Sequence, residues 1–562
     1  MVKGVEVVVV VGVVLMVAAG RAEANKVLSS IPKDASSEAV VTTEGGQIVG
    51  VINDTARAFL GIPYGNAPIG PNRWRPTIPR DPWFPDVLTV QEFGAGCPQL
   101  CNLPPDTCPY VQSEDCLFLD IFTPRLDTIT EPRPVMVFFH GGNFQQGSAG
   151  TLLYDGSALA NRTDVVVVVA NYRLGALGFL VNQEIQGNYG FMDQQFVLGW
   201  VRRNIASFGG NQNLVTIFGQ SAGGTSTAAH QVAPSSFGLY DQIISESNPV
   251  ALNLNTLEKQ REAGAAFAEF AGCANLTNTE LTVCLHQLDV DTILAAQAKV
   301  NSDVAIFVDA LFGLFYPWTP TVDYDLIPGQ PVNLIPEGKF NRVPMIVGSV
   351  TDEAWLFIWQ VQPFPVPTPE YNLILKALFP GYADQVAEMY PVPKFALDTR
   401  VQINNLITDY LFTCPIRYLA RNVRTIAPEV PLYKYQFNHC MSFYEGGWGP
   451  HYEYCYCSDE MIPNVVCHGG ELAFVFDTAA LDGYVYQPGE DNLAHQMVSY
   501  WGNFAHTGDP NNGPASTEIN WPLYDPTDMV NLDLNITIRT IDHIRQEYCD
   551  FWDTITPLYM QP

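Results

Sequence analysis

Basic side chains, long apolar runs and repeated segments are all scarce in this chain of 562 residues. Only 28 Lys and Arg stand against 58 Asp and Glu, which gives a formal net charge of -30. Nucleic acids and anionic membranes are recognised by basic patches, so we expect neither as a partner. Beyond the N-terminus, no apolar run reaches the roughly 18 to 20 residues that a spanning helix needs. We therefore expect no stable membrane insertion.

The N-terminal segment is the exception to this scarcity of apolar runs. Lys3 is followed by an apolar run over residues 7–19 and by an Ala-Glu-Ala triplet at 22–24. This order is typical of a secretory signal peptide. We expect residues 1–24 to be that signal and residues 25–562 to be secreted, outside the cell or into a secretory vesicle. Retention of the apolar run as a membrane anchor is the alternative.

Cysteine and sequon content point to the same compartment. The twelve cysteines are an even number behind a signal peptide, which favours disulfides over free thiols. A metal site at Cys455 and Cys457 is a weaker alternative, because an oxidising compartment favours disulfide bridges. Four Asn-x-Ser/Thr sequons are candidate surface glycan sites, at Asn53, Asn161, Asn275 and Asn535.

Short runs of β-favouring residues alternate with longer stretches of mixed polarity. The runs at 135–139, 165–170 and 215–218 predict buried strands, and the segment 191–208 is compatible with a helix. This alternation predicts the α/β class, with a large, mostly parallel sheet covered by helices on both faces. The candidate site residues below are spread over 140–468, so we expect one large catalytic domain with long insertions.

A candidate nucleophile follows one of the predicted strands. Residues 219–223 match Gly-x-Ser-x-Gly around Ser221, and the two glycines leave room for a serine at a tight strand-to-helix turn. A serine hydroxyl attacks a carbonyl only when a base removes its proton and N–H donors stabilise the oxyanion. The sequence therefore predicts that a base and such donors exist elsewhere in the chain.

The donors are expected where the strand at 135–139 ends in His140-Gly141-Gly142. The N–H groups of Gly141 and Gly142, with that of Ala222 just after the nucleophile, would form a three-donor oxyanion hole. A glycine turn without a catalytic role is the alternative interpretation of this segment.

Taken in order, these motifs resemble the cholinesterase and carboxylesterase group of α/β-hydrolases, the type-B carboxylesterases. The resemblance covers nearly all of the mature chain and implies the α/β-hydrolase fold, with hydrolysis of carboxylic esters through an acyl-enzyme on Ser221. It implies no cofactor and no metal, because side chains and backbone supply the chemistry. The matching segments are 59–64, 113–119, 140–142, 187–190, 193–194, 204–205 and 208–211, which run into the serine turn.

The resemblance also implies an acid and a base. Glu353 follows the strand-like segment at 347–350 and matches the family's acid, with the adjacent Asp352 as the alternative. Among nine histidines, His468 stands before Gly469 as in the family's His-Gly, and it completes the chain order Ser, Glu, His. Glu353 would hold the histidine in one tautomer and stabilise the imidazolium.

Six cysteines can be paired through the resemblance, as Cys97 with Cys116, Cys273 with Cys284, and Cys414 with Cys549. The family offers no common pattern for the other six, of which Cys101 and Cys108 form the easiest local pair. These six are Cys101, Cys108, Cys440, Cys455, Cys457 and Cys467.

Two departures from the cholinesterases favour a general esterase that acts on a small-molecule ester. Gln220 stands where cholinesterases carry Glu, and the segment 97–116 lacks the Trp that binds choline by cation–π attraction. A lipase with the Cys97–Cys116 loop as its lid is the first alternative. A non-catalytic adhesion or storage protein is the second, and the presence of all three triad residues argues against it.

Overall fold

The computed structural model describes residues 38–555, apart from 104–106, 126–130, 303–314, 444–454 and 456–464. The predicted signal peptide at 1–24 and the cysteine at position 457 therefore lie outside the described residues. Within the described ranges, no helix is long and apolar enough to cross a membrane.

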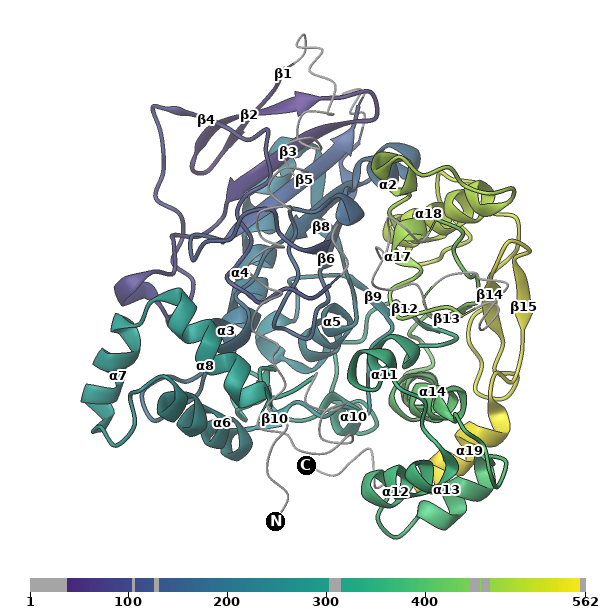
Figure 1. Ribbon diagram of the computed structural model, residues 1–562. Coiled ribbons are helices and arrows are strands. Elements are labelled where there is room, and N and C mark those ends of the chain that lie inside the picture. The colour runs from purple at the N-terminus through teal and green to yellow at the C-terminus, as the bar shows by residue number, and fades with distance from the viewer. Residues whose placement is uncertain are drawn as a thin grey trace.

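A large sheet runs through the molecule in the order β1-β2-β3-β5-β7-β6-β8-β9-β12-β13-β14-β15, with β4 paired to β2 (Figure 1). The adjacent strands from β7 to β14 in this order are parallel, and the strands at both edges are antiparallel. The strands are β1 (Glu38–Thr43), β2 (Gly46–Ile52), β3 (Ala56–Pro63), β4 (Val87–Thr89), β5 (Phe118–Pro124), β6 (Arg133–Phe139), β7 (Val166–Ala170), β8 (Gly210–Gln220), β9 (Gln242–Glu246), β12 (Met345–Val350), β13 (Leu432–Phe437), β14 (Asn531–Leu534) and β15 (Arg539–Ile541), and β10 (Asn255–Thr256) pairs separately with β11 (Thr321–Val322).

Helices cover the sheet and form its long insertions, with α6 to α8 between β9 and β12 and with α11 to α15 between β12 and β13 (Figure 1). The described helices are α2 (Ser157–Thr163), α3 (Gly175–Phe179), α4 (Tyr189–Asn204), α5 (Ala222–Val232), α6 (Leu257–Phe270), α7 (Asn278–Gln287), α8 (Val290–Ser302), α10 (Pro331–Leu334), α11 (Trp355–Val361), α12 (Thr368–Leu378), α13 (Ala383–Met389), α14 (Arg400–Thr408), α15 (Cys414–Ile426), α17 (Leu472–Val475), α18 (Glu490–Thr507) and α19 (Gln546–Thr554).

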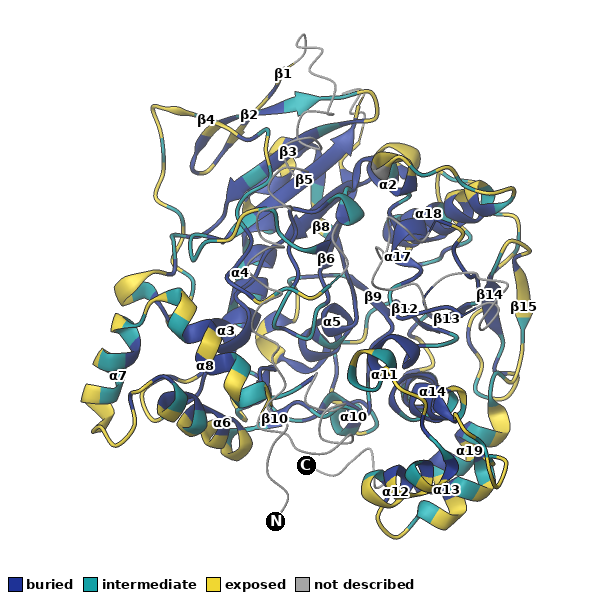
Figure 2. Ribbon diagram, in the orientation of Figure 1, coloured by how far each residue is buried: buried dark blue, intermediate teal, exposed yellow. Residues whose placement is uncertain are grey.

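Alternate residues of the central strands pack on opposite faces of the sheet. In β6, Val137 and Phe139 belong to a core shared with α4, whereas Met136 and Phe138 belong to a second core shared with α2 and α18. Burial on both faces explains why this strand reads as an unbroken apolar run. Figure 2 shows the central strands buried and the outer sides of α6, α7, α12 and α13 exposed.

The fold class predicted from the sequence is confirmed in its central part. The three predicted strands correspond to β6, β7 and β8, with β7 beginning one residue later than predicted, at Val166. The predicted helical segment 191–208 is two elements, because α4 ends at Asn204 and a short 3-10 turn over Ile205–Phe208 follows. Gly209 closes this turn at a φ of 82°, a left-handed conformation that favours glycine.

Disulfides are present for all three cysteine pairs implied by the resemblance and for the local pair Cys101–Cys108. A fifth bridge joins Cys455 to Cys467, directly before the candidate base. The alternative of a metal site at Cys455 is therefore wrong, because its sulfur is in a covalent bridge. No described cysteine is free.

Two of the disulfides should differ in how much they stabilise the fold. Cys414 and Cys549 are 135 residues apart, whereas Cys101 and Cys108 are 7 residues apart. By the chain-entropy account, restricting the unfolded chain stabilises the fold by about 5 kcal/mol for the long loop and about 2.5 kcal/mol for the short one. We expect alanine at both ends of the long bridge to lower the free energy of unfolding in urea more than alanine at both ends of the short bridge. Equal losses would contradict this account.

Candidate active site

The turn between β8 and α5 carries Ser221 in a strained backbone conformation, with a φ of 61° and a ψ of -121°. The packing leaves no room for a side chain at either flanking glycine, Gly219 or Gly223. A Cβ on Gly219 would lie 2.6 Å from the Gly223 carbonyl carbon, and a Cβ on Gly223 would lie 1.9 Å from the Phe139 carbonyl oxygen. The Ser221 N–H donates to the Glu246 carbonyl oxygen at 3.0 Å, which ties the turn to the end of β9.

The candidate acid and base meet beside this turn. Glu353 follows the end of β12, and its Oε2 lies 2.5 Å from His468 Nδ1. Its Oε1 accepts the Val350 N–H at 2.9 Å, so the carboxylate is held at both oxygens. The rings of Phe357 and Phe412 lie 5.0 and 5.3 Å from the imidazole. An Nδ1–H bonded to the carboxylate leaves Nε2 as a proton acceptor.

The acceptor nitrogen of His468 has a neighbour whose role was missed at the sequence level. The Gln220 Nε2 lies 3.1 Å from His468 Nε2, so the amide donates to the neutral base. From the sequence, Gln220 was interpreted only as the loss of a charge. The structure shows a hydrogen bond that the Ser221 hydroxyl must replace before it can pass its proton to the histidine.

The turn after β6 lies against the nucleophile. Gly141 and Gly142 line a cavity that also contains Ser221 and His468, and Ala222 lines an adjoining cavity that contains Ser221. A Cβ on Gly141 would lie 3.1 Å from the Ser221 Cβ, so this backbone segment is in close reach of the nucleophile. The three residues predicted to supply the oxyanion donors therefore each line a cavity that contains Ser221.

Asn143 follows these glycines and is a further residue that sequence reasoning missed. It has a φ of 57° and lines both cavities. Asn tolerates this left-handed conformation better than most residues, and the signal available in the sequence was its place after two glycines.

His140 is excluded as the base. Its ring is fully buried and stacks on Tyr172 at 4.6 Å, and its Nδ1 lies 2.8 Å from the Gly141 carbonyl oxygen. Burial lowers the pKa of His140 to about 4, so it is neutral at physiological pH. His140 therefore precedes the predicted oxyanion donors without acting as the base.

Asp352 is adjacent to the acid in sequence but is bonded to other groups. Its Oδ2 accepts the Val466 N–H at 3.1 Å, and its Oδ1 accepts from Asn404 Nδ2 at 2.8 Å. The backbone of Asp352 also forms a bridge with Cys467. Asp352 thus holds the segment that carries His468, whereas Glu353 contacts the imidazole itself.

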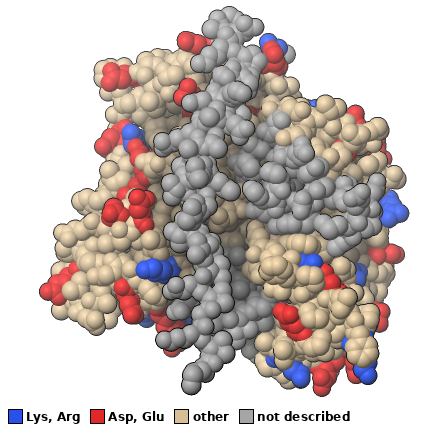
Figure 3. Space-filling model, in the orientation of Figure 1, with Lys and Arg blue, Asp and Glu red and all other residues tan. Residues whose placement is uncertain are grey.

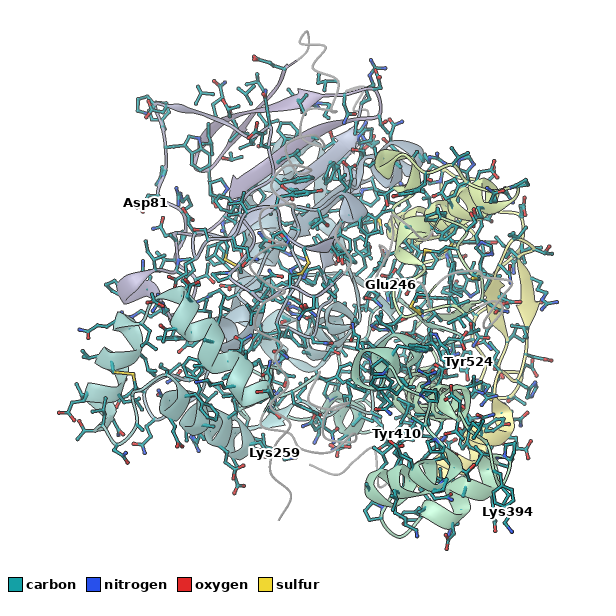
Figure 4. The ribbon with its side chains drawn as sticks, in the orientation of Figure 1. Asp81, Glu246, Lys259, Lys394, Tyr410 and Tyr524 are labelled. Carbon is teal, nitrogen blue, oxygen red and sulfur yellow. A yellow bond between two sulfur atoms is a disulfide. The ribbon has the colours of Figure 1, made fainter. Side chains whose placement is uncertain are left out.

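Two further buried carboxyl groups lie near Glu353. Glu246, at the end of β9, accepts from Trp501 Nε1 at 2.6 Å, and Glu471 accepts from the Ser247 hydroxyl at 3.2 Å. Burial raises the pKa of Glu246 to about 8 and raises that of Glu471 well above its ordinary value. Both groups therefore hold a proton at neutral pH. Figure 4 shows Glu246 well inside the molecule.

The remaining predicted positions are the candidate glycan sites. Asn161 and Asn275 are exposed, as a glycan requires, whereas Asn53 and Asn535 are half-buried and hydrogen-bonded to backbone groups. On the face shown in Figure 3, acidic side chains are scattered over several elements rather than gathered in one patch. Within the described ranges, no group of three or more His, Cys, Asp or Glu side chains could hold a metal ion.

Comparison with known proteins identifies the family of the chain. The model of the Carboxylesterase family matches residues 37–552. The chain is 37% identical to the cAMP-regulated D2 protein of Dictyostelium discoideum, over 90% of each chain. It is 32% identical to carboxylesterase 1E of Mus musculus, over 92% of this chain and 93% of that one.

Among solved structures, the chain is similar to PNB esterase. The TM-score is 0.75 at 31% identity, covering 91% of this chain and 99% of that chain. Family, fold and length therefore agree, and the expected resemblance is confirmed. The chain belongs to the carboxylesterase family of α/β-hydrolases and is a carboxylic-ester hydrolase.

Proposed function

We propose that this protein is a secreted serine carboxylesterase, in which residues 25–562 act as one catalytic domain. The observation that carries the proposal is the contact between Glu353 and His468 beside the strained turn at Ser221. The disulfides support secretion, because such bridges persist in oxidising compartments.

The reaction follows from the placement of these groups. His468 Nε2 takes the Ser221 hydroxyl proton as the serine oxygen bonds to the ester carbonyl carbon. The N–H groups of Gly141, Gly142 and Ala222 stabilise the negative charge on the carbonyl oxygen. The imidazolium, stabilised by Glu353, then gives its proton to the departing alkoxide. Water attacks the acyl-enzyme by the same steps and releases the acid.

A lipase is the second candidate, and one observation favours it. Leu103 and Thr107, from the loop closed by the Cys97–Cys116 disulfide, line the cavity at Ser221. A loop in this place would cover a bound lipid ester, as a lipase lid does. Activity that rises sharply when an ester substrate passes from monomers to micelles would favour the lipase over the esterase.

Replacement of Ser221 by alanine should abolish ester turnover without unfolding the protein. The covalent step needs the hydroxyl, whereas alanine keeps the small side chain that this turn allows. An organophosphonate ester should label Ser221 in the parent protein, as peptide mass spectrometry would detect. Residual activity in the variant together with labelling at another serine would refute the assignment.

Mutation should distinguish the roles of the two adjacent carboxyl groups, Glu353 and Asp352. We expect Glu353→Gln to lower kcat by about three to four orders of magnitude, because only Glu353 fixes the tautomer and charge of His468. Asp352→Asn should cost about tenfold or less, since it only weakens the hold on the segment of His468. Steady-state kinetics would be read beside the melting temperature of each variant. The reverse ranking would show that the wrong carboxyl group has been assigned.

A positive charge on the alcohol part of the substrate should not raise kcat/KM. Binding of a quaternary ammonium by cation–π attraction needs an aromatic face such as that of tryptophan. Trp318 and Trp355 are buried and neither lines the cavity at Ser221, and Trp448 lies outside the described residues. The distant attraction of a net charge of -30 is screened over about 8 Å at physiological ionic strength. We therefore expect acetylthiocholine to have no higher kcat/KM than an uncharged thioester of matched size. A preference of about tenfold that persists in high salt, about 1.4 kcal/mol, would reveal an unrecognised cation site.

A further inference from the structure

The direction of proton transfer distinguishes two sides of Ser221. The leaving alkoxide receives its proton from His468, so the alcohol part of the ester lies on the histidine side. The cavity that contains both Ser221 and His468 has a volume of about 740 Å³ when the space open to solvent is included. The acyl part lies on the other side, where a smaller cavity, of about 350 Å³ by the same measure, contains Ser221 and Ala222.

The acyl side is compact and apolar. Phe144, Leu252 and Phe315 are among the residues that line it. The Tyr316 hydroxyl there already donates to the Asn253 carbonyl oxygen at 2.6 Å, so it has no proton left for a substrate. Such a largely apolar surface suits a short hydrocarbon chain on the acyl part.

The alcohol side is lined by amide side chains that have free hydrogen-bonding capacity. The Gln146 Oε1 accepts the Asn102 N–H at 2.9 Å, which leaves its NH2 group available. The side chains of Asn143 and Gln360 line the same cavity and make no hydrogen bond to another described residue. Each amide offers donors and an acceptor, which together match the two roles of a hydroxyl group.

This side also lacks fixed charge in the part of the chain that the structure describes. The ionisable side chains among its described lining residues are His468 and Tyr154. Burial raises the pKa of Tyr154 above its ordinary value, so its ring carries no charge at neutral pH. The lining therefore suits an alcohol that is uncharged and rich in hydroxyl groups.

We propose that the protein selects esters that join a compact acyl group to a small, uncharged polyhydroxy alcohol, of the glycerol or sugar type. The inference rests on the proposed function, because the two sides are defined by proton transfer from His468. An alcohol without hydroxyl groups would leave the amides of Asn143, Gln146 and Gln360 without partners when it displaces water. Sites built to bond a substrate hydroxyl discriminate strongly against analogues that lack it.

The test compares glycerol monoacetate with propyl acetate, which have the same acyl group and carbon chain and differ in two hydroxyl groups. We expect kcat/KM to be at least about tenfold higher for glycerol monoacetate in the parent protein. Gln360→Leu keeps the size of the side chain but removes its amide, and should lower this preference about fivefold. The matched control is Gln546→Leu, an exposed glutamine on α19, which should leave the preference unchanged.

A second variant guards against misfolding of the first. Asn143→Gly removes an amide at a φ of 57°, which glycine adopts without strain, and should also lower the preference. Glycerol monodecanoate should be hydrolysed more slowly than the monoacetate, because the acyl side is small. The inference would be overturned if the ratio of kcat/KM for glycerol monoacetate to that for propyl acetate were near one in the parent protein. It would also be overturned if Gln360→Leu and Gln546→Leu lowered this ratio equally. Hydrolysis of neither acetate would instead refute the proposed function, and activity on propyl acetate tells these outcomes apart.

Discussion

The close approach of α5 to the end of β6 is the constraint on which the site depends. The Phe139 carbonyl lies where a Cβ on Gly223 would be, so the helix can begin directly after β8 only with glycine at this position. The same approach brings Ser221 beside the turn that carries the oxyanion donors. Backbone packing, rather than any side chain that takes part in the reaction, thus holds the strained nucleophile in place.

Burial governs the electrostatics around the base. Three carboxyl groups, those of Glu246, Glu353 and Glu471, are fully buried. Charges on all three would repel one another in a region of low dielectric constant. Burial keeps Glu246 and Glu471 protonated at neutral pH, so neither adds a negative charge beside Glu353, which faces His468.

Local patterns in the sequence predicted the central strands and the serine turn, because each depends on residues that are neighbours in the chain. The choice of His468 among nine histidines needed the resemblance to a family, since nothing beside it in the sequence shows that Glu353 lies across from it. The bond from Gln220 to His468 and the position of Asn143 between two cavities depend on side-chain directions, which no periodicity encodes. The Cys455–Cys467 bridge could not be paired for the same reason.

The distance along the chain between nucleophile and base has a consequence for biosynthesis. Ser221 is translated long before His468, and the segment of His468 is joined to Cys455 by a disulfide that forms only under oxidising conditions. A chain still emerging from the ribosome therefore carries the serine without its base. Until the segment of His468 folds against the turn at Ser221, such a chain lacks the pairing of candidate base and candidate nucleophile on which the proposed hydrolysis depends.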